Sequence, residues 1–411
     1  MASSADSSTY FRKGFGLKGE VEGDLASDYA GQVVDNLRAN DYTLTENGIT
    51  IRLAREFGFC YGVERAVEYA YQTRKKFPDR DLYLVGEIIH NPNVNARLRE
   101  MGVTILESGE RGFDFSALGE RDVVIMPAFG VTIDDFAALR EKGCVLVDTT
   151  CGSVLNVWKR VESYAREGFT ALIHGKYYHE ETRATASQVR KYPNGHYLVV
   201  RNMDEAQIIL GFIEGRVSRA QVLEKFSPHA VSPGFDPDVH LRQIGVANQT
   251  TMLASESLAI AAEVGASIER ARGAEARATD FRSFDTICSA TQERQDAVKE
   301  LLEEPLDAMV VIGGFNSSNT ISLTALCAEK IPSYHVETPE AIDPDNGTIH
   351  HRLAGVTHHE ATTENWLPMD RPVRIGITAG ASTPNSKIGE AVRRIIATRT
   401  QLALRSASDE R

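Results

Sequence analysis

Three cysteines are the residues of this sequence with the greatest capacity for chemistry. Cys60, Cys151 and Cys288 each stand where a hydrophobic, strand-like run gives way to a polar, turn-forming stretch. In open α/β folds ligands bind beyond the carboxyl ends of the strands, so cysteines far apart in sequence can converge there. Three thiolates around one point predict a metal or iron–sulfur site with one coordination position left open.

The remaining cysteines are interpreted as packing residues. The chain has only five cysteines in 411 residues, and so small and odd a number argues against a disulfide scaffold. Cys144 precedes a strand-like run and is expected at the edge of a core. Cys327 lies on the apolar face of a predicted helix, where a packed thiol is expected.

Polar turns form a second group of candidates. Residues 248–251, 313–319 and 378–384 are rich in hydroxyl and amide side chains, and each follows an apolar strand. Each turn taken alone is typical of a helix N-cap. Three of them in one chain favour an anion site built from exposed N–H groups. The sequence has no GxxxxGK[ST] loop, so a P-loop nucleotide site is not supported.

Histidine and carboxylate side chains complete the set. His179 and Glu181 follow a strand-like run, where an imidazole can bind an anion while a carboxyl group handles protons. His90 ends another strand and is placed to join the same cluster. A solvated polar loop is the alternative interpretation of the segment 174–181.

Composition excludes several classes of partner. The formal net charge of -12 argues against nucleic acid or an anionic membrane surface, because both need a basic face. No apolar run reaches the roughly 20 residues that a membrane helix needs. The Ser-rich N-terminus has no apolar stretch for secretion, and its early acidic residues argue against a transit peptide. The sequence therefore predicts a cytoplasmic protein.

The elements that must position these residues are short apolar runs alternating with amphipathic stretches. Strands are predicted over 82–85, 123–126, 145–147, 170–173, 197–200, 244–247, 309–312 and 373–377, and helices over 63–76, 133–142, 154–166, 257–272, 291–303, 318–330 and 385–398. This alternation predicts an α/β fold with mostly parallel sheets covered on both faces. We predict an N-terminal arm (1–48), three α/β units with weak pseudo-repeat character (49–150, 151–285 and 286–400, with one of the three cysteines each) and a frayed tail (401–411).

These motifs, in this order, resemble the 4-hydroxy-3-methylbut-2-enyl diphosphate reductase (IspH/LytB) family. The resemblance runs from about residue 49 to 394. It rests on Gly58-Phe-Cys-Tyr-Gly-Val-Glu-Arg-Ala, Ile89-His-Asn-Pro, Asp148-Thr-Thr-Cys, His179-Glu-Glu, Asn248-Gln-Thr-Thr, Thr286-Ile-Cys-Ser-Ala-Thr-Gln-Glu-Arg-Gln, Asn316-Ser-Ser-Asn and Ala379-Gly-Ala-Ser. Tyr10-Phe-Arg-Lys-Gly-Phe-Gly is similar to the N-terminal arm of the cyanobacterial and plant branch.

The resemblance implies an activity and a set of roles. The family removes a hydroxyl group reductively from an allylic diphosphate and forms isopentenyl and dimethylallyl diphosphate, the last step of the methylerythritol phosphate pathway. It implies a [4Fe–4S] cluster held by Cys60, Cys151 and Cys288 at the centre of three α/β units. Glu181 falls at the proton-donor position. The residues implied to hold the substrate are His90, His179, Thr250, Ser317, Ser318, Asn319 and Ser382. The implied electron donor is ferredoxin, with flavodoxin as the other candidate.

Three positions depart from the common family pattern. Phe129 stands where many bacterial members have a histidine, so this position cannot donate a hydrogen bond to a diphosphate. Gly152 follows Cys151 where proline is usual, which is expected to loosen the turn behind a ligand. Glu180 occupies a position that is often proline.

Other functions were weighed on the same residues. Gly58-x-Cys60-x-Gly62 resembles a nucleophile elbow, and His179 with Glu181 could complete a glutamine amidotransferase-like hydrolase. That alternative leaves Cys151, Cys288 and the three polar turns without a role. A zinc-holding scaffold would need close CxxC pairs, which are absent. An iron–sulfur regulator would need a DNA-binding module or a basic face.

Overall fold

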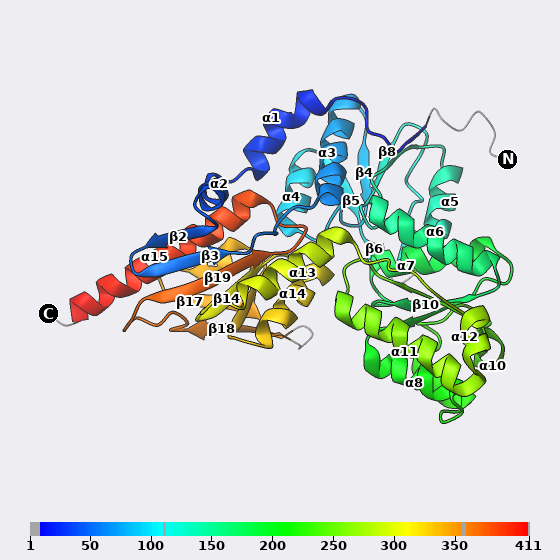
Figure 1. The fold of residues 1–411 in the computed structure, drawn as a ribbon. Coiled ribbons are helices and arrows are strands. Elements are labelled where there is room, and N and C mark those ends of the chain that lie inside the picture. Colours follow the sequence, from blue (N-terminus) through cyan, green and yellow to red (C-terminus); the bar gives the residue numbers. More distant parts are fainter. Residues whose placement is uncertain (1–8, 110–111, 355–358, 410–411) are drawn as a thin grey trace. The chain divides into compact units, whose positions relative to one another are not determined.

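The computed structural model describes residues 9–109, 112–354 and 359–409, with side chains as far as residue 405. The outer ends of the predicted arm and tail, residues 1–8 and 410–411, lie outside this range. The fold is α/β, and the strands of its three main sheets are mostly parallel, as predicted (Figure 1). The chain divides into two compact units and passes between them several times.

The first unit comprises residues 9–13, Asp79–Ile88 and Gly102–Cys288. One of its sheets is fully parallel, in the order β1 (Tyr10–Phe11), β9 (Val145–Asp148), β8 (Val123–Met126), β4 (Leu82–Val85) and β5 (Val103–Leu106). Valine, isoleucine and leucine fill β8 and β9, which are buried throughout, as is typical of strands covered on both faces. Helix α5 (Ile133–Glu141) lies between β8 and β9 in the chain, and β6 (Ser108–Gly109) pairs separately with β7 (Gly112–Phe113).

The second sheet of this unit is also parallel. Its order is β11 (Tyr197–Val200), β10 (Thr170–His174), β12 (Ile244–Asn248) and β13 (Phe281–Ser283). Tyr164 packs over it so closely that a Cβ on Gly245 would lie 2.4 Å from its ring. The accompanying helices are α6 (Gly152–Arg166), α7 (Glu180–Ser187), the 3₁₀ turn Gln188–Lys191, α8 (Met203–Ile213), α9 (Arg219–Phe226), α10 (Pro237–His240), α11 (Ala254–Arg272) and α12 (Ala274–Asp280).

The second unit comprises Gly14–Pro78, Ile89–Met101 and Ser289–Arg411. Its sheet runs β16 (Ile342–Asp343), β17 (Thr348–Arg352), β15 (Ser333–Val336), β14 (Ala308–Ile312), β19 (Val373–Ala379), β3 (Ile49–Leu53) and β2 (Thr43–Glu46), with β18 (Glu360–Glu364) beside β17. The four strands from β15 to β3 are parallel and the edge strands are antiparallel.

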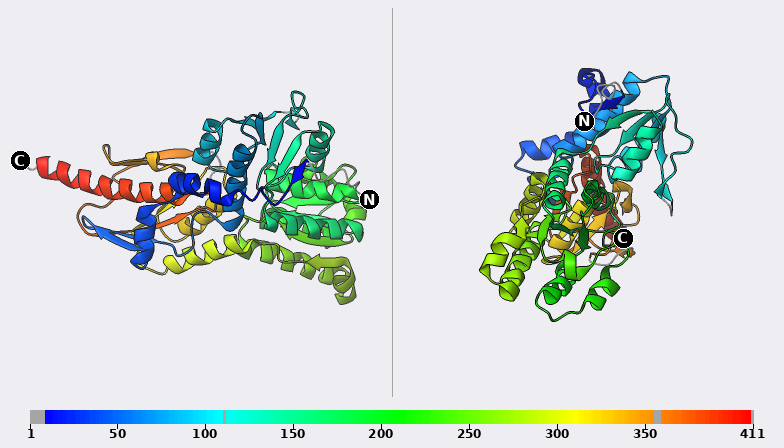
Figure 2. Two further views of the ribbon diagram at one scale, coloured as in Figure 1. Left: turned by 90° about the horizontal axis from the view of Figure 1, so that it is seen from above. Right: turned by 90° about the vertical axis from the view of Figure 1, so that its right-hand side faces the viewer.

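Helices cover both faces of this third sheet. The helices of this unit are α1 (Lys18–Tyr29), α2 (Gln32–Ala39), α3 (Tyr61–Lys76), α4 (Pro92–Glu100), α13 (Ser289–Leu301), α14 (Ser318–Ala328) and α15 (Asn385–Asp409), with a 3₁₀ turn at Pro339–Ala341. Of these, α2 and α15 pack on one face of the sheet, and α13 and α14 pack on the other. Alternate residues of β14 point to opposite cores: Val310 packs with α15, and Val311 packs with α13 and α14. Figures 1 and 2 show α15, in red, along one face of the sheet.

The units differ from the continuous segments predicted from the sequence. β3 pairs with β19, so residues 49–78 belong with the C-terminal part of the chain rather than with residues 79–150. The predicted arm contains β1, α1, α2 and β2, and α15 continues to Asp409, beyond its predicted end at residue 398. Local periodicity cannot show which distant strands pair, and this explains the difference in grouping.

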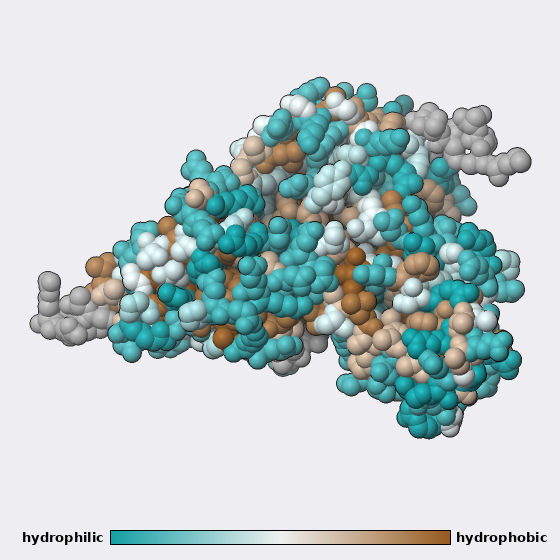
Figure 3. Space-filling model, viewed as in Figure 1, coloured by the Kyte–Doolittle hydropathy of each residue, from teal (hydrophilic) through white to brown (hydrophobic). Residues whose placement is uncertain are grey.

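None of the helices within the described residues is long and apolar enough to cross a bilayer. On the face shown in Figure 3 the residues are mostly hydrophilic, and the apolar ones are scattered.

Candidate functional site

The three candidate ligand cysteines each lie at the start of a helix. Cys60 is the N-cap of α3, Cys151 is the N-cap of α6, and Cys288 immediately precedes α13. Two of them lie well beyond their preceding strands, since β3 ends at Leu53 and β13 ends at Ser283. Helix N-termini offer free N–H groups and a positive dipole end, which favour thiolates. All three are reduced thiols of intermediate exposure.

Cys151 and Cys288 lie near each other in the first unit. The Ser153 hydroxyl, on the first turn of α6, donates to Cys288 Sγ at 3.3 Å. Burial raises the pKa of the Cys151 thiol and the neighbouring Cys288 adds to the rise, while N–H groups of Ser153 and Val154 oppose it. Two neighbouring thiols that tend to repel each other when both are ionised are suited to share a cation.

Three further predicted residues meet in the same unit. Glu181 is only 1% exposed, and its carboxylate accepts from the Thr250 N–H at 2.6 Å and from the Thr250 hydroxyl at 3.0 Å. His179 caps α7, and its Nδ1 accepts from the Glu181 N–H at 3.1 Å. Because Nδ1 is an acceptor, a neutral His179 ring carries its proton on Nε2. An imidazole that can donate through Nε2 therefore lies next to a residue with a buried carboxyl group.

Phe129 connects this network with the thiols. Its ring meets the His179 ring edge to face, with centroids 5.6 Å apart. The carbonyl of the preceding residue, Ala128, accepts from the Cys151 N–H at 2.9 Å. Phe129 therefore packs against the imidazole instead of offering a hydrogen bond. At Gly152 a Cβ would meet nothing within 4 Å, so the backbone has space for a side chain there, and the expected looseness of this turn stays a prediction.

In the second unit Cys60 is tied to two of the polar turns. The Cys60 N–H donates to the Ala381 carbonyl at 3.3 Å, and the Ala381 N–H donates to Asn319 Oδ1 at 3.0 Å. Ser382 lies beside Ala381 and is 9% exposed. Ser317 caps α14 by accepting from the Thr320 N–H, and Ser318 and Asn319 follow in the first helical turn. The unit thus places one thiol next to a helix start rich in buried polar groups.

His90 lies against the same turn. A Cβ on Gly314 would come within 2.4 Å of the His90 carbonyl oxygen, so the two segments approach as closely as glycine permits. The His90 side chain is 7% exposed. Asn91 then caps α4 by accepting from the Val94 N–H at 3.1 Å. The second unit therefore gathers His90, Ser317, Ser318, Asn319 and Ser382.

Unsatisfied donors mark this turn as suited to an anion. Asn319 Nδ2 and Thr320 Oγ1 are buried and find no hydrogen-bond partner among the described residues. Leaving a buried donor unpaired costs about 1–3 kcal/mol. An anion with several acceptor oxygens would satisfy such donors at the start of a helix.

One residue that sequence reasoning did not assign holds the Cys60 loop. Arg294, on α13 and 3% exposed, donates to the Gly58 carbonyl at 2.7 Å and to the Phe59 carbonyl at 3.2 Å. Gly58 has φ +67°, and a Cβ there would lie 3.0 Å from the Thr383 carbonyl. The sequence signal for this residue was its place in the motif that contains Cys288.

Asp148 is a second residue of this kind. The Tyr10 hydroxyl donates to it at 2.5 Å, Arg12 Nε lies 3.3 Å away, and the Thr150 N–H donates at 2.9 Å. This network joins β1 to the turn that leads into Cys151. The motif Asp148-Thr-Thr-Cys was visible in the sequence, but its partner strand was not.

The two remaining cysteines are core residues, as predicted. Cys144 is 2% exposed and Cys327 is fully buried. Burial raises the pKa of the Cys327 thiol to about 12, so it stays protonated.

Comparisons with known proteins identify the family of this chain. A family model described as LytB protein matches residues 51–396. The 4-hydroxy-3-methylbut-2-enyl diphosphate reductase of Thermosynechococcus vestitus is 47% identical over 396 residues, covering 96% of each chain. The reductase of the same name from a Synechococcus strain is 48% identical over 393 residues, covering 95% of this chain and 96% of its own.

Solved structures agree with these relatives. A structure of (E)-4-hydroxy-3-methyl-but-2-enyl diphosphate reductase, described as the terminal enzyme of the non-mevalonate pathway, is 28% identical with a TM-score of 0.51; the match covers 84% of this chain and 98% of that one. The fold is also that of the Plasmodium falciparum reductase, which is 20% identical with a TM-score of 0.59 over 84% and 86% of the two chains. None of these proteins supports the glutamine amidotransferase alternative. The chain belongs to the LytB family of 4-hydroxy-3-methylbut-2-enyl diphosphate reductases.

Proposed function

We propose that this protein reduces (E)-4-hydroxy-3-methylbut-2-enyl diphosphate to isopentenyl and dimethylallyl diphosphate. The C–O bond of the allylic alcohol breaks, two electrons and two protons are consumed, and water leaves. The observation that carries the proposal is the buried Glu181–Thr250–His179 network, which Phe129 and Ala128 connect with Cys151 in the first unit. A buried acid near free thiols suits proton delivery to a leaving hydroxyl group.

Cys60, Cys151 and Cys288 would hold one [4Fe–4S] cluster per chain. Their placement at three helix starts fits such a group, because each helix offers N–H groups and a favourable dipole to an anionic ligand. When bound, the cluster supplies single electrons and a Lewis-acidic iron. Cys144 and Cys327 are too deeply buried to contribute.

The other residues divide between proton transfer and substrate binding. Glu181 donates the proton, and Thr250 orients its carboxyl group through two hydrogen bonds. The His179 Nε2–H is a donor for the diphosphate. His90, Ser317, Ser318, Asn319 and Ser382 hold the remaining phosphate oxygens, and the unpaired Asn319 Nδ2 supports this assignment.

The electron donor and the compartment belong to the same proposal. Ferredoxin is the expected donor, and flavodoxin is the other candidate. The expected location is cytoplasmic, where thiolate ligands stay reduced.

Metal analysis tests the ligand set. Anaerobically purified protein is expected to be brown, with iron and labile sulfide in near-equal amounts. Serine at Cys60, Cys151 or Cys288 should lower the iron content strongly, whereas the matched Cys144→Ser variant should keep it. Colourless, iron-free protein that hydrolyses glutamine would refute the proposal.

A carboxamide variant tests the acid. Glu181→Gln keeps the shape of the side chain but removes its transferable proton, so turnover should fall by about a hundredfold or more while iron content stays the same. Glu180→Gln is the matched control, since this neighbour is outside the Thr250 network. Equal activity of the Glu181→Gln variant and the wild type would show that another group supplies the proton.

A further inference from the structure

An exposed aromatic residue lies a few residues before Cys288 in the first unit. Phe284 is 42% exposed. Its ring stacks on that of Tyr164, with centroids 6.3 Å apart, and the guanidinium of Arg160 lies 3.9 Å from its centroid. Tyr164 is itself fixed, because its hydroxyl donates to the Val246 carbonyl at 2.9 Å. Phe284 is therefore held at the surface by a rigid support.

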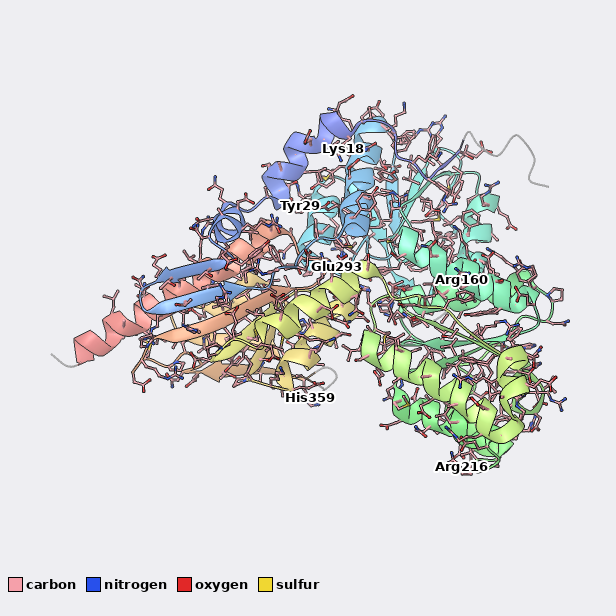
Figure 4. The ribbon with its side chains drawn as sticks, in the orientation of Figure 1. Lys18, Tyr29, Arg160, Arg216, Glu293 and His359 are labelled. Carbon is pink, nitrogen blue, oxygen red and sulfur yellow. The ribbon has the colours of Figure 1, made fainter. Side chains whose placement is uncertain are left out.

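Arg160 lies on this ring, and two further cations are close to Arg160 or Phe284 in the sequence. Lys159 and Arg160 are exposed neighbours on α6, and Figure 4 labels Arg160 on that helix. Arg282 lies two residues before Phe284 and uses its guanidinium on the carbonyls of Ala278 and Phe281. Arg160 and Arg282 both act electrostatically on Tyr164, and Glu167 acts on it with the opposite sign.

The charges of these cations are not paired in salt bridges within the part of the chain that the structure describes. Among the described residues none of Lys159, Arg160 and Arg282 forms a salt bridge, whereas some other cations of the unit do: Arg166 pairs with Glu167, and Lys191 pairs with Glu162. The nearest exposed carboxylate in sequence, Asp285, accepts from the Ile287 N–H at 3.0 Å. In a chain of net charge -12, this leaves a local excess of positive charge around an aromatic ring, which we call the Phe284 patch (Lys159, Arg160, Arg282 and Phe284).

The patch is linked directly to a proposed cluster ligand. The segment from Phe284 to Cys288 touches α6 at both ends: at Arg160 through the ring, and at Ser153 through the 3.3 Å bond to the thiol. Ser153 and Arg160 are seven residues apart on one helix, a rise of about 10 Å. A partner seated on the patch would thus be separated from Cys288 by a short, continuously packed path.

We propose that the Phe284 patch is the docking surface for a small, acidic, one-electron carrier protein. This inference rests on the proposed function, which consumes two electrons from outside the chain. Complexes between redox proteins are small and transient, and complementary charge steers them. An acidic carrier matches these three cations, and Phe284 supplies an apolar contact beside Arg160.

Charge reversal with two kinds of reductant tests the inference. Arg160→Glu and Lys159→Glu are made singly, with Arg216→Glu as a control of equal charge change on a different part of the unit, also labelled in Figure 4. The probe is a plant-type [2Fe–2S] ferredoxin. Its Kd, measured by calorimetry at low salt, should rise at least tenfold in both patch variants and stay within twofold in the control. The Kd of the wild type should rise with salt more steeply than that of the variants.

Turnover separates this inference from the proposed function. Ferredoxin-driven kcat/KM should fall about as much as binding does, while turnover with dithionite and methyl viologen stays unchanged. Loss of activity with methyl viologen in the wild type would refute the proposed function itself. An active wild type whose patch variants bind ferredoxin like the control, or which does not bind ferredoxin at all, would overturn the docking surface. Lys159→Glu keeps the test valid if Arg160→Glu unfolds, because Lys159 has no described contact to lose.

Discussion

A histidine buried in the second unit makes the stability of that unit depend on pH. His335, on β15, is 1% exposed, and its Nε2 lies 2.8 Å from the Gly313 carbonyl oxygen. Burial is the main cause that lowers its pKa to about 4, the Gly313 carbonyl opposes the shift, and the neighbouring Arg352 and His351 add to it. Protonation of this imidazole is therefore less favourable in the folded unit than in the unfolded chain.

The sign and the size of the effect follow from linkage. An unfolded chain holds this histidine at a pKa of about 6.5, so between that pH and 4 the unfolded state binds a proton that the folded state does not. Stability from this residue is complete above pH 6.5 and is lost as the pH falls toward 4. Lowering the pH from 7 to 5 crosses about 1.5 units of that interval, which corresponds to ~2 kcal/mol at 1.36 kcal/mol per unit.

Urea unfolding, followed by the fluorescence of a tryptophan in the second unit, measures this loss of stability. The chain has two tryptophans. Trp366 is buried in the core of the second unit, while Trp158 belongs to the first. In a Trp158→Phe background, Trp366 fluorescence reports the second unit at pH 7 and pH 5. His335→Gln keeps an N–H donor for the Gly313 carbonyl but cannot titrate, so it should lose ~2 kcal/mol less than its parent.

The control is an exposed histidine on a neighbouring strand. His350 binds Glu360 at 2.9 Å on the surface, and His350→Gln should leave the pH dependence close to that of the parent. Equal losses of stability in the His335→Gln variant and its parent would refute the reasoning.

Three further substitutions probe residues around the proposed site. Tyr10→Phe removes a hydrogen bond to the buried Asp148, worth about 1.5–3 kcal/mol, and should lower the melting temperature; an unchanged calorimetric transition would contradict the role of this network. Asn319→Ala should raise KM for the diphosphate about tenfold, a loss of ~1.4 kcal/mol, with kcat nearly unchanged. If instead kcat alone falls, Asn319 acts on the reaction rather than on binding. Arg294→Lys cannot reach the several carbonyls that the guanidinium holds, so iron content should drop while circular dichroism stays native; full iron retention would show that the Cys60 loop does not depend on this arginine.

The sequence pattern predicted the central strands well. β8 and β12 are continuous apolar runs with clear ends, and parallel burial on both faces produces that pattern directly. Helices such as α13 were found because their apolar residues repeat at helical spacing. The helices α1 and α2 were not predicted, because their polar composition gives a weak local signal and only a few side chains, such as Val34 and Leu37, enter the core.

The site was predictable as a list of residues but not as an arrangement. Cys60, Glu181 and Asn319 could each be named from a motif. Their local partners could not: Thr250 holds Glu181 across 69 positions, and Arg294 reaches back 236 positions to Gly58. Such contacts depend on which strands and helices become neighbours, and one sequence alone does not encode that in any local pattern.

The pairing of β3 with β19 also sets the order in which the molecule can be completed during synthesis. These neighbouring strands leave the ribosome roughly 320 residues apart, an interval of tens of seconds at 5–20 residues per second. β3 and the Cys60 turn must wait through that interval without their β19 partner, whereas the second sheet of the first unit is complete once β13 has emerged. The last strand to be synthesised, β19, is therefore the partner of the strand that leads to Cys60. A truncated chain that lacks β19 would still complete the sheet next to Cys151 and Cys288, but the strand before Cys60 would lack its partner.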